Sequence, residues 1–135
     1  EKEFQLRIGN INNLMNEAVS YDAERVETVK TRLRTALDEL KVNVDENRFE
    51  QELIFYLEKY DITEEKVRLG NHLSYFLETL NGTEANGRKL GFITQEMGRE
   101  INTMGSKSNH TEMQKLVVMM KDELEKIKEQ VLNVL

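Results

Sequence analysis

Residues 113–134 read MQKLVVMMKDELEKIKEQVLNV, and their apolar pattern indicates the fold class of the chain. Its apolar side chains recur at alternating intervals of four and three residues, the heptad spacing that places them along one side of an α-helix. Such a seam is stable in water only when other helices cover it, within the chain or across a subunit interface. The stretch therefore predicts a helix of a helical bundle. Its seam positions are Met113, Val117, Met120, Leu124, Ile127, Val131 and Val134.

Helical spacing of apolar side chains also runs through the rest of the chain. Residues 4–19 and 26–40 each carry such a stripe, but its register slips around Ser20-Tyr21-Asp22. Residues 1–44 are therefore expected to form one long helix or a pair of helices. No segment alternates with period two for long enough to predict a strand. We predict an all-α fold, a bundle built from long helical hairpins, in which residues 45–135 form a helical core within the same domain.

Polar residues and glycines mark where the later helices are expected to begin and end. One helix is expected over residues 46–60, and NGTEANG at residues 81–87 is the clearest loop of the chain. The expected caps and stops are Asp45 and Thr63 before the second and third helices, Asn81-Gly82 after the third, Gly105 after the fourth, and Asn109 with Glu112 before the last.

The composition excludes several classes of protein. The 135 residues include no cysteine, so a disulfide framework, thiol catalysis and a thiolate zinc site are impossible. No apolar run is long enough to span a membrane, and we expect a soluble protein without a membrane partner. The chain begins at Glu1 without an initiator Met or a signal-like stretch, which favours a piece of a longer, cytoplasmic protein. The formal net charge is −6, and residues 45–85 hold 10 acidic and 4 basic side chains.

Residues 87–107, GRKLGFITQEMGREINTMGSK, carry the most informative polar pattern. Glu96 and Glu100 are four residues apart and fall on one helical face, with Arg99 and Lys107 beside them. Two carboxylates so placed could share Mg²⁺ or Mn²⁺, and the cationic side chains could hold a phosphate near that metal. On spacing alone, ordinary surface ion pairs of a few tenths of a kcal/mol remain an alternative.

A second candidate is the series Glu65, Arg68 and His72, at spacings i, i+3 and i+7. These residues lie on the flank of an apolar helical stripe. His72 could act as a general acid or base or as a metal ligand. A buried or paired structural histidine is the alternative. The other histidine, His110, is interpreted as a turn residue.

Several motifs resemble the C-terminal domain of the YicC-like proteins of bacteria. They are Arg48-Phe-Glu-Gln-Glu52, Lys59-Tyr-Asp-Ile-Thr-Glu-Glu65, Gly87-Arg-Lys-Leu90, Arg99-Glu-Ile-Asn-Thr103 and Gly105-Ser-Lys107. The resemblance covers essentially the whole chain in order, although residues 1–44 match only as a helical pattern. It implies a separate N-terminal domain outside this chain, a divalent-metal-dependent endoribonuclease activity, usually with Mn²⁺, and assembly into a hexamer.

The resemblance carries over motif positions, and their roles here are chemical inference. The positions are Glu52, Asp61, Glu65, Arg68, His72, Arg88, Lys89, Gln95, Glu96, Arg99, Glu100, Asn102, Ser106 and Lys107. We expect the catalytic residues to be His72, Glu96 and Glu100. We expect Glu52, Glu96 and Glu100 to bind the metal, Mn²⁺ first and Mg²⁺ second. The partner is expected to be RNA and not DNA, and the residues expected to bind it are Arg68, Arg88, Lys89, Arg99 and Lys107.

Three positions depart from the family pattern. Gly91 stands where an acidic residue is usual, Gly98 stands where Asn is usual, and the chain ends Leu132-Asn-Val-Leu135 in place of Gln-Asn-Ile-Glu. Gly91 puts in doubt any mechanism that needs a carboxylate there. Two other functions remain open, a non-catalytic helical oligomerisation module and an adaptor that binds another protein through the acidic residues 45–85.

Overall fold

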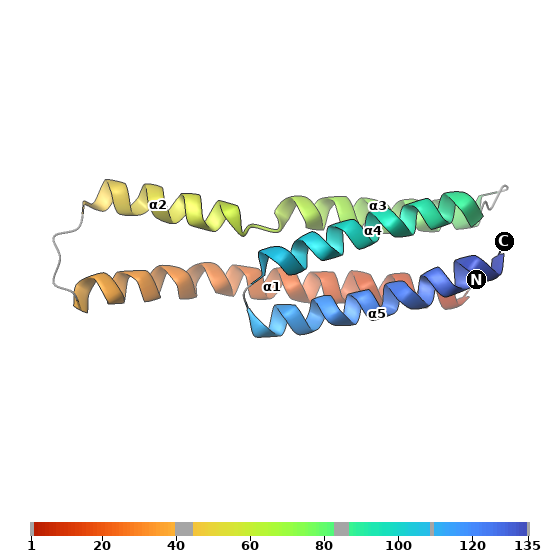
Figure 1. The fold of residues 1–135 in the computed structure, drawn as a ribbon, viewed down its shortest axis with the longest axis horizontal. Helices are drawn as coiled ribbons and strands as arrows, with labels where there is room; N and C mark the ends of the chain where they lie inside the picture. The colour runs from red at the N-terminus through yellow and green to blue at the C-terminus, as the bar shows by residue number, and fades with distance from the viewer. Residues whose placement is uncertain (1, 40–44, 83–86, 109, 135) are drawn as a thin grey trace.

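The apolar stripes of the sequence become α-helices, as Figure 1 shows. The computed structural model describes residues 2–39, 45–82, 87–108 and 110–134. They form α1 (Lys2–Glu39), α2 (Glu46–Lys59), α3 (Thr63–Asn81), α4 (Gly87–Lys107) and α5 (Thr111–Val134). No strand occurs within these ranges, so the predicted all-α fold is confirmed. None of the helices described there is long and apolar enough to cross a membrane.

Four of the helices pack side by side into one bundle (Figure 1). Helix α1 packs against α5 and α3, and α4 packs against α3 and α5. Their apolar stripes meet in one continuous core. Burying a large apolar side chain contributes about 1.5–3 kcal/mol relative to leaving it exposed, so this core drives the association of the helices. Its largest fully buried members are Phe76, Ile11, Ile62, Leu69, Leu90, Met97, Ile101, Met104, Met113, Met120 and Ile127.

The predicted seam of α5 lies inside this core. The side chains of Met113, Val117, Met120, Leu124, Ile127 and Val131 are all buried. The side chain of Val134 lies outside the described part of the chain. The prediction that residues 113–134 bury their seam against other helices is therefore confirmed, and the partners are α1 and α4 of the same chain.

Gly105 does not end α4, which continues to Lys107. The glycine is instead a packing position, because a Cβ atom there would lie 3.1 Å from Cγ1 of Val117 on α5. Two turns earlier, a Cβ atom at Gly98 would lie 3.3 Å from Cδ2 of Leu124. The two glycines thus allow α4 and α5 to approach more closely than helices with side chains at these positions could.

Helix α1 is a single helix, which settles the alternative left open for the N-terminal residues. Its first half belongs to the bundle, whereas its second half extends past the ends of α4 and α5 (Figure 1). Helix α2 runs beside this second half and makes at most sparse contact with the other helices. The guanidinium of Arg34 links the two, donating to both carboxylate oxygens of Glu46 at 2.8 and 2.7 Å and covering the Phe49 ring at 4.2 Å.

The helix caps agree with the sequence in part. Asp45 caps α2 as predicted, since its side chain accepts from the backbone N–H groups of Asn47 and Arg48. The cap predicted at Thr63 is wrong, because Thr63 is already helical and Asp61 Oδ1 accepts its backbone N–H at 3.1 Å. At the start of α5 the acceptor is Nδ1 of His110, with the N–H of Glu112 at 3.2 Å and that of Met113 at 3.4 Å. The cap predicted at Asn109 and most of the loop predicted at residues 81–87 lie outside the described residues.

Candidate functional site

A cluster of paired charges lies where α3 packs against α4. It consists of Glu65 and Arg68 on α3 and of Glu100 and Lys107 on α4. Carboxylates are almost never fully buried unless they are paired, yet the side chains of Glu65 and Glu100 are only 2% and 7% exposed. Their burial is possible because each one has a cation from the facing helix. We call these four residues the α3–α4 charge cluster.

Lys107 holds one end of the cluster. Its Nζ donates to both carboxylate oxygens of Glu65 at 3.1 Å and to the backbone oxygen of Asp61 at 3.0 Å. Asp61 lies in the short connection between α2 and α3, so one ammonium group joins the end of α4 to the start of α3. An ammonium carries three donors, and all three bonds go to acceptors of this corner.

Arg68 holds the other end and is half exposed. Its Nε donates to both carboxylate oxygens of Glu100 at 2.8 and 3.2 Å. Its two terminal nitrogens donate to Glu64 and Glu65, each at 3.2 Å. Hydrogen bonding to Glu100 raises the pKa of the Arg68 guanidinium above its ordinary value, and Glu64 adds to this effect. A planar guanidinium with several donors is also the group best shaped to hold a phosphate.

The other predicted residues of α3 and α4 lie along these two helices beyond the cluster. Further along, Nζ of Lys89 on α4 lies 5.0 Å from the ring centre of Tyr75 on α3. Along α3 the half-buried His72 falls between Arg68 and Tyr75, and along α4 Glu96 falls between Glu100 and Lys89. The two packed helices thus carry, along their length, six residues that the sequence singled out, namely Arg68, His72, Lys89, Glu96, Glu100 and Lys107. Arg88 and Arg99 are exposed on α4.

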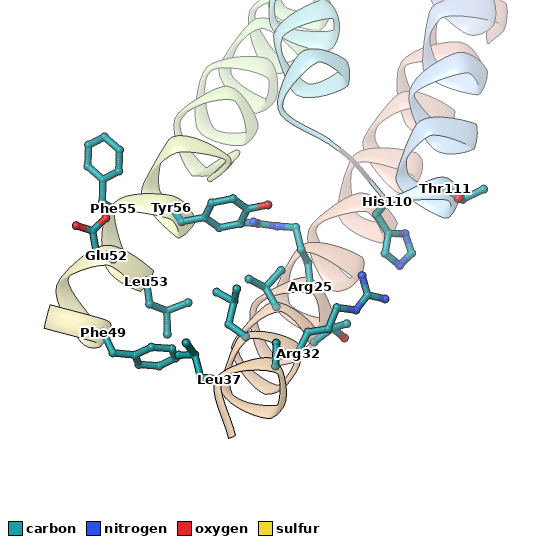
Figure 2. A pocket seen from close by; sticks show the side chains of 14 residues that line it. Arg25, Arg32, Leu37, Phe49, Glu52, Leu53, Phe55, Tyr56, His110 and Thr111 are labelled. Carbon is teal, nitrogen blue, oxygen red and sulfur yellow. The ribbon is translucent and has the colours of Figure 1, made fainter. Parts of the chain in front are cut away.

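Glu52 lies elsewhere, and this separates the predicted metal ligands. It is exposed on α2, beside the groove between α2 and α1, and Figure 2 shows it on the outer side of that helix. Among the residues that the structure describes, no three His, Asp or Glu side chains are grouped so that they could hold a metal ion. Both oxygens of Glu100 instead accept from Arg68, whose guanidinium lies where a cation would be bound. Glu52 therefore does not join Glu96 and Glu100, and the His, Asp and Glu side chains of the described residues form no donor set that fits a divalent cation.

Two residues were not given their structural roles from the sequence. Glu65 belongs to the predicted series with Arg68 and His72 and to the motif positions, but its burial and its pairing with Lys107 were not predicted; it is the most buried carboxylate of the described residues. Arg25 was not singled out at all, although its side chain is 4% exposed. The sequence did hold a signal for it, because Arg25 continues the buried stripe of α1 seven residues after Ala18. A charged residue at a core position of an amphipathic helix calls for a partner.

The α3–α4 charge cluster is suited to exchanging partners with a phosphate. Arg68 is half exposed and its donors are held in place by Glu64, Glu65 and Glu100. A phosphodiester could take the place of one carboxylate, because both are anionic groups with acceptor oxygens. The carboxylate released in this way would become free to accept a proton.

Comparison with known proteins gives these residues a context. The sequence matches the family described as "Endoribonuclease YicC-like, C-terminal" over residues 18–135. It is 38% identical over 136 residues to the "Probable endoribonuclease YicC" of Clostridioides difficile (strain 630), covering 98% of this chain and 46% of that protein. It is 36% identical over 104 residues to the protein of the same name from Haemophilus influenzae, covering 77% of this chain and 36% of that protein. The chain therefore spans less than half the length of these relatives.

Proposed function

The chain belongs to the YicC-like endoribonuclease family, and from this premise we propose that it is the C-terminal part of an enzyme that cleaves phosphodiester bonds within RNA. The observation that supports a site on this chain is the pairing of Arg68 with the buried Glu100 between α3 and α4. Exposed ion pairs are common on helix surfaces and indicate no function. Buried carboxylates are less common, and here they lie among the family motif residues, which favours a functional site.

The cationic side chains would bind the RNA backbone. Arg68 and Lys107 lie at the cluster and Lys89 lies further along the same pair of helices, while Arg88 and Arg99 are exposed on α4. Phosphates bound along this line would be held by charge, so affinity would fall with salt. The net charge of −6 limits what one chain can bind. We therefore include assembly of several copies in the proposal, a hexamer as the family resemblance implies, and the cytoplasm as its compartment.

His72 and Glu100 would carry the proton transfers. When a phosphate takes Arg68 as its partner, Glu100 loses two hydrogen bonds and its oxygens become free to accept a proton. His72 lies one turn after Arg68 on α3, where it would act on the same bound RNA strand. One of the two groups would remove the proton from the attacking oxygen, and the other would protonate the leaving oxygen.

Dependence on a divalent cation, Mn²⁺ first and Mg²⁺ second, stays a proposal that the family resemblance supports. The donor set of the described residues does not form such a site. We assign no step of the reaction to the cation. Its ligands would have to include groups from outside the described residues, such as a neighbouring copy or the remainder of a full-length protein.

A non-catalytic oligomerisation module is the second candidate function. Helix α2 supports it, because Ile54 and Phe55 are 53% and 69% exposed there, and α2 makes at most sparse contact with the other helices. Large exposed apolar groups on the outer side of a helix are typical of an interface. An adaptor that binds through residues 45–85 has only the acidic charge of this segment in its favour.

Cleavage of a labelled RNA by full-length protein, with Mn²⁺ and with EDTA, tests the proposal. Glu100→Gln keeps the size of the side chain but removes the charge that pairs with Arg68. The matched control is Glu123→Gln, which removes a carboxylate 14% exposed that pairs with Arg7 between α5 and α1. We expect the first variant to lose cleavage and the second to keep it, with both folded by circular dichroism. If the Glu100→Gln variant cleaves RNA at the same rate as the unaltered protein, or if the unaltered protein cleaves no RNA, the result would support the oligomerisation module instead.

A further inference from the structure

A groove runs between the second half of α1 and α2, away from the α3–α4 charge cluster. Its volume is about 820 Å³, which is in the range of pockets that hold small organic ligands. Figure 2 shows Leu37 from α1 facing Phe49 and Leu53 from α2 across this groove. The end nearest the bundle is different, because it is lined by Arg25, Tyr56 and His110. The groove is therefore apolar along its length and polar at one end.

Arg25 at this end has a donor without an acceptor. Its side chain is 96% buried, and its Nε donates to Oδ1 of Asp22 at 2.9 Å. One terminal nitrogen, Nη1, is buried and makes no hydrogen bond to any part of the chain that the structure describes. Buried N–H groups without a partner are rare because each one forfeits its bond to water. This arginine thus points to an acceptor that belongs to a ligand.

Other donors surround the same end. Nδ1 of His110 accepts two backbone N–H groups, so the neutral ring carries its hydrogen on Nε2 and can donate from there. Arg32 extends from α1 on the side where His110 lies (Figure 2). The acidic side chain that lines the groove is Glu52, which points outward from α2. A ligand at this end would meet donors and positive charge, and its other part would meet apolar side chains.

We propose that this groove binds one unpaired nucleotide of an RNA strand. A nucleobase has flat apolar faces, which can stack on the ring of Tyr56 at the polar end of the groove, and acceptor atoms on its edge, which Arg25 at the same end can satisfy. The phosphate attached to it would lie at Arg32 and His110. A base in a duplex cannot enter, because its edge is paired and its faces are stacked. The choice of RNA as the source of the base rests on the proposed function, whereas the groove and its unpaired donor do not.

The test is binding of a single-stranded oligoribonucleotide that carries one 2-aminopurine and 2′-O-methyl groups that prevent cleavage. Stacking in the groove should quench the 2-aminopurine fluorescence of the strand when wild-type protein binds. Arg25→Met should weaken binding about tenfold, and so should Leu33→Trp, which fills the groove from an exposed position without removing charge. Lys128→Met, on the distant end of α5, is the control for loss of one positive charge and should change binding little.

The same variants separate the other outcomes. Unchanged binding and fluorescence with both Arg25→Met and Leu33→Trp would overturn the inference. A lower oligomer mass of Leu33→Trp by light scattering, without a change in RNA binding, would mean that another protein chain fills the groove and would also overturn it. Quenching by a wild-type protein that cleaves no RNA would leave the inference standing and refute only the proposed function.

Discussion

The ammonium group of Lys107 lies 3.1 Å from both carboxylate oxygens of Glu65, a side chain that is 2% exposed. The two residues are 42 positions apart in sequence. Their contact fixes how far the end of α4 lies along α3, and with it which residues face one another along the two helices. The row of predicted functional residues depends on this register.

Removing the partner of a buried carboxylate should be costly. Lys107→Met leaves Glu65 with only Arg68 at 3.2 Å, and we expect the free energy of unfolding to fall by about 3 kcal/mol. Lys115→Met is the control, because Lys115 is 65% exposed in its pair with Glu112 and should matter by less than about 1 kcal/mol. Urea denaturation followed by circular dichroism measures both. If both variants lower the free energy of unfolding by the same small amount, the buried pair of Lys107 and Glu65 contributes no more to stability than an exposed ion pair.

The ion pair between Arg34 and Glu46 should make the stability of the contact between α2 and α1 depend on pH. Hydrogen bonding to Arg34 lowers the pKa of Glu46 below its ordinary value of 4.5. The pair therefore stabilises the contact at pH values above 4.5, and this contribution is lost as the pH falls through the lowered pKa. In Arg34→Met the pKa of Glu46 should rise toward its ordinary value, as an NMR titration of the carboxyl carbon would record. Lys59→Met, at the other end of α2, should leave that pKa where it is.

The two kinds of glycine in the helices should respond in opposite ways to the same substitution. Gly105→Leu places a side chain against Val117 and should destabilise the bundle by about 1–3 kcal/mol. At Gly9 an added Cβ atom would meet nothing within 4 Å, so Gly9→Leu should raise stability by up to about 1 kcal/mol, because leucine favours a helix over glycine. Melting temperatures decide between them. A destabilised Gly9→Leu protein would contradict the open surface described at that position.

Two leucines of α5 allow a test of which face of this helix is buried. Leu124 is 3% exposed and Leu132 is 70% exposed. Leu124→Asp should unfold the bundle, because it places an unpaired charge in the core, whereas Leu132→Asp should stay folded. Circular dichroism and light scattering report the fold and the mass of each variant. A folded Leu124→Asp protein with unchanged mass would show that this seam does not hold the bundle together.

Local spacing was enough to predict the helices and their buried faces. The stripe of residues 113–134 and the cap at Asp45 follow from the period of the helix and from the donors at its first turn, both of which are properties of neighbouring residues. The same reasoning failed at Gly105, because its role depends on Val117 of another helix. It also left the length of the first helix open, because packing against α5 and α3 was not visible in the sequence.

The spacing of apolar residues alone predicts an all-α protein and places most of its polar motif residues on two helical stretches, residues 63–81 and 87–107. How these residues pair follows from the packing of the helices, since contacts between helices depend on how far each one slides past the next. That register gives Glu100 to Arg68 and Glu65 to Lys107, and it leaves Glu52 on a different helix beside the groove. It also buries Arg25 at the end of that groove, because the stripe of α1 continues past the bundle into a space that α2 only partly covers.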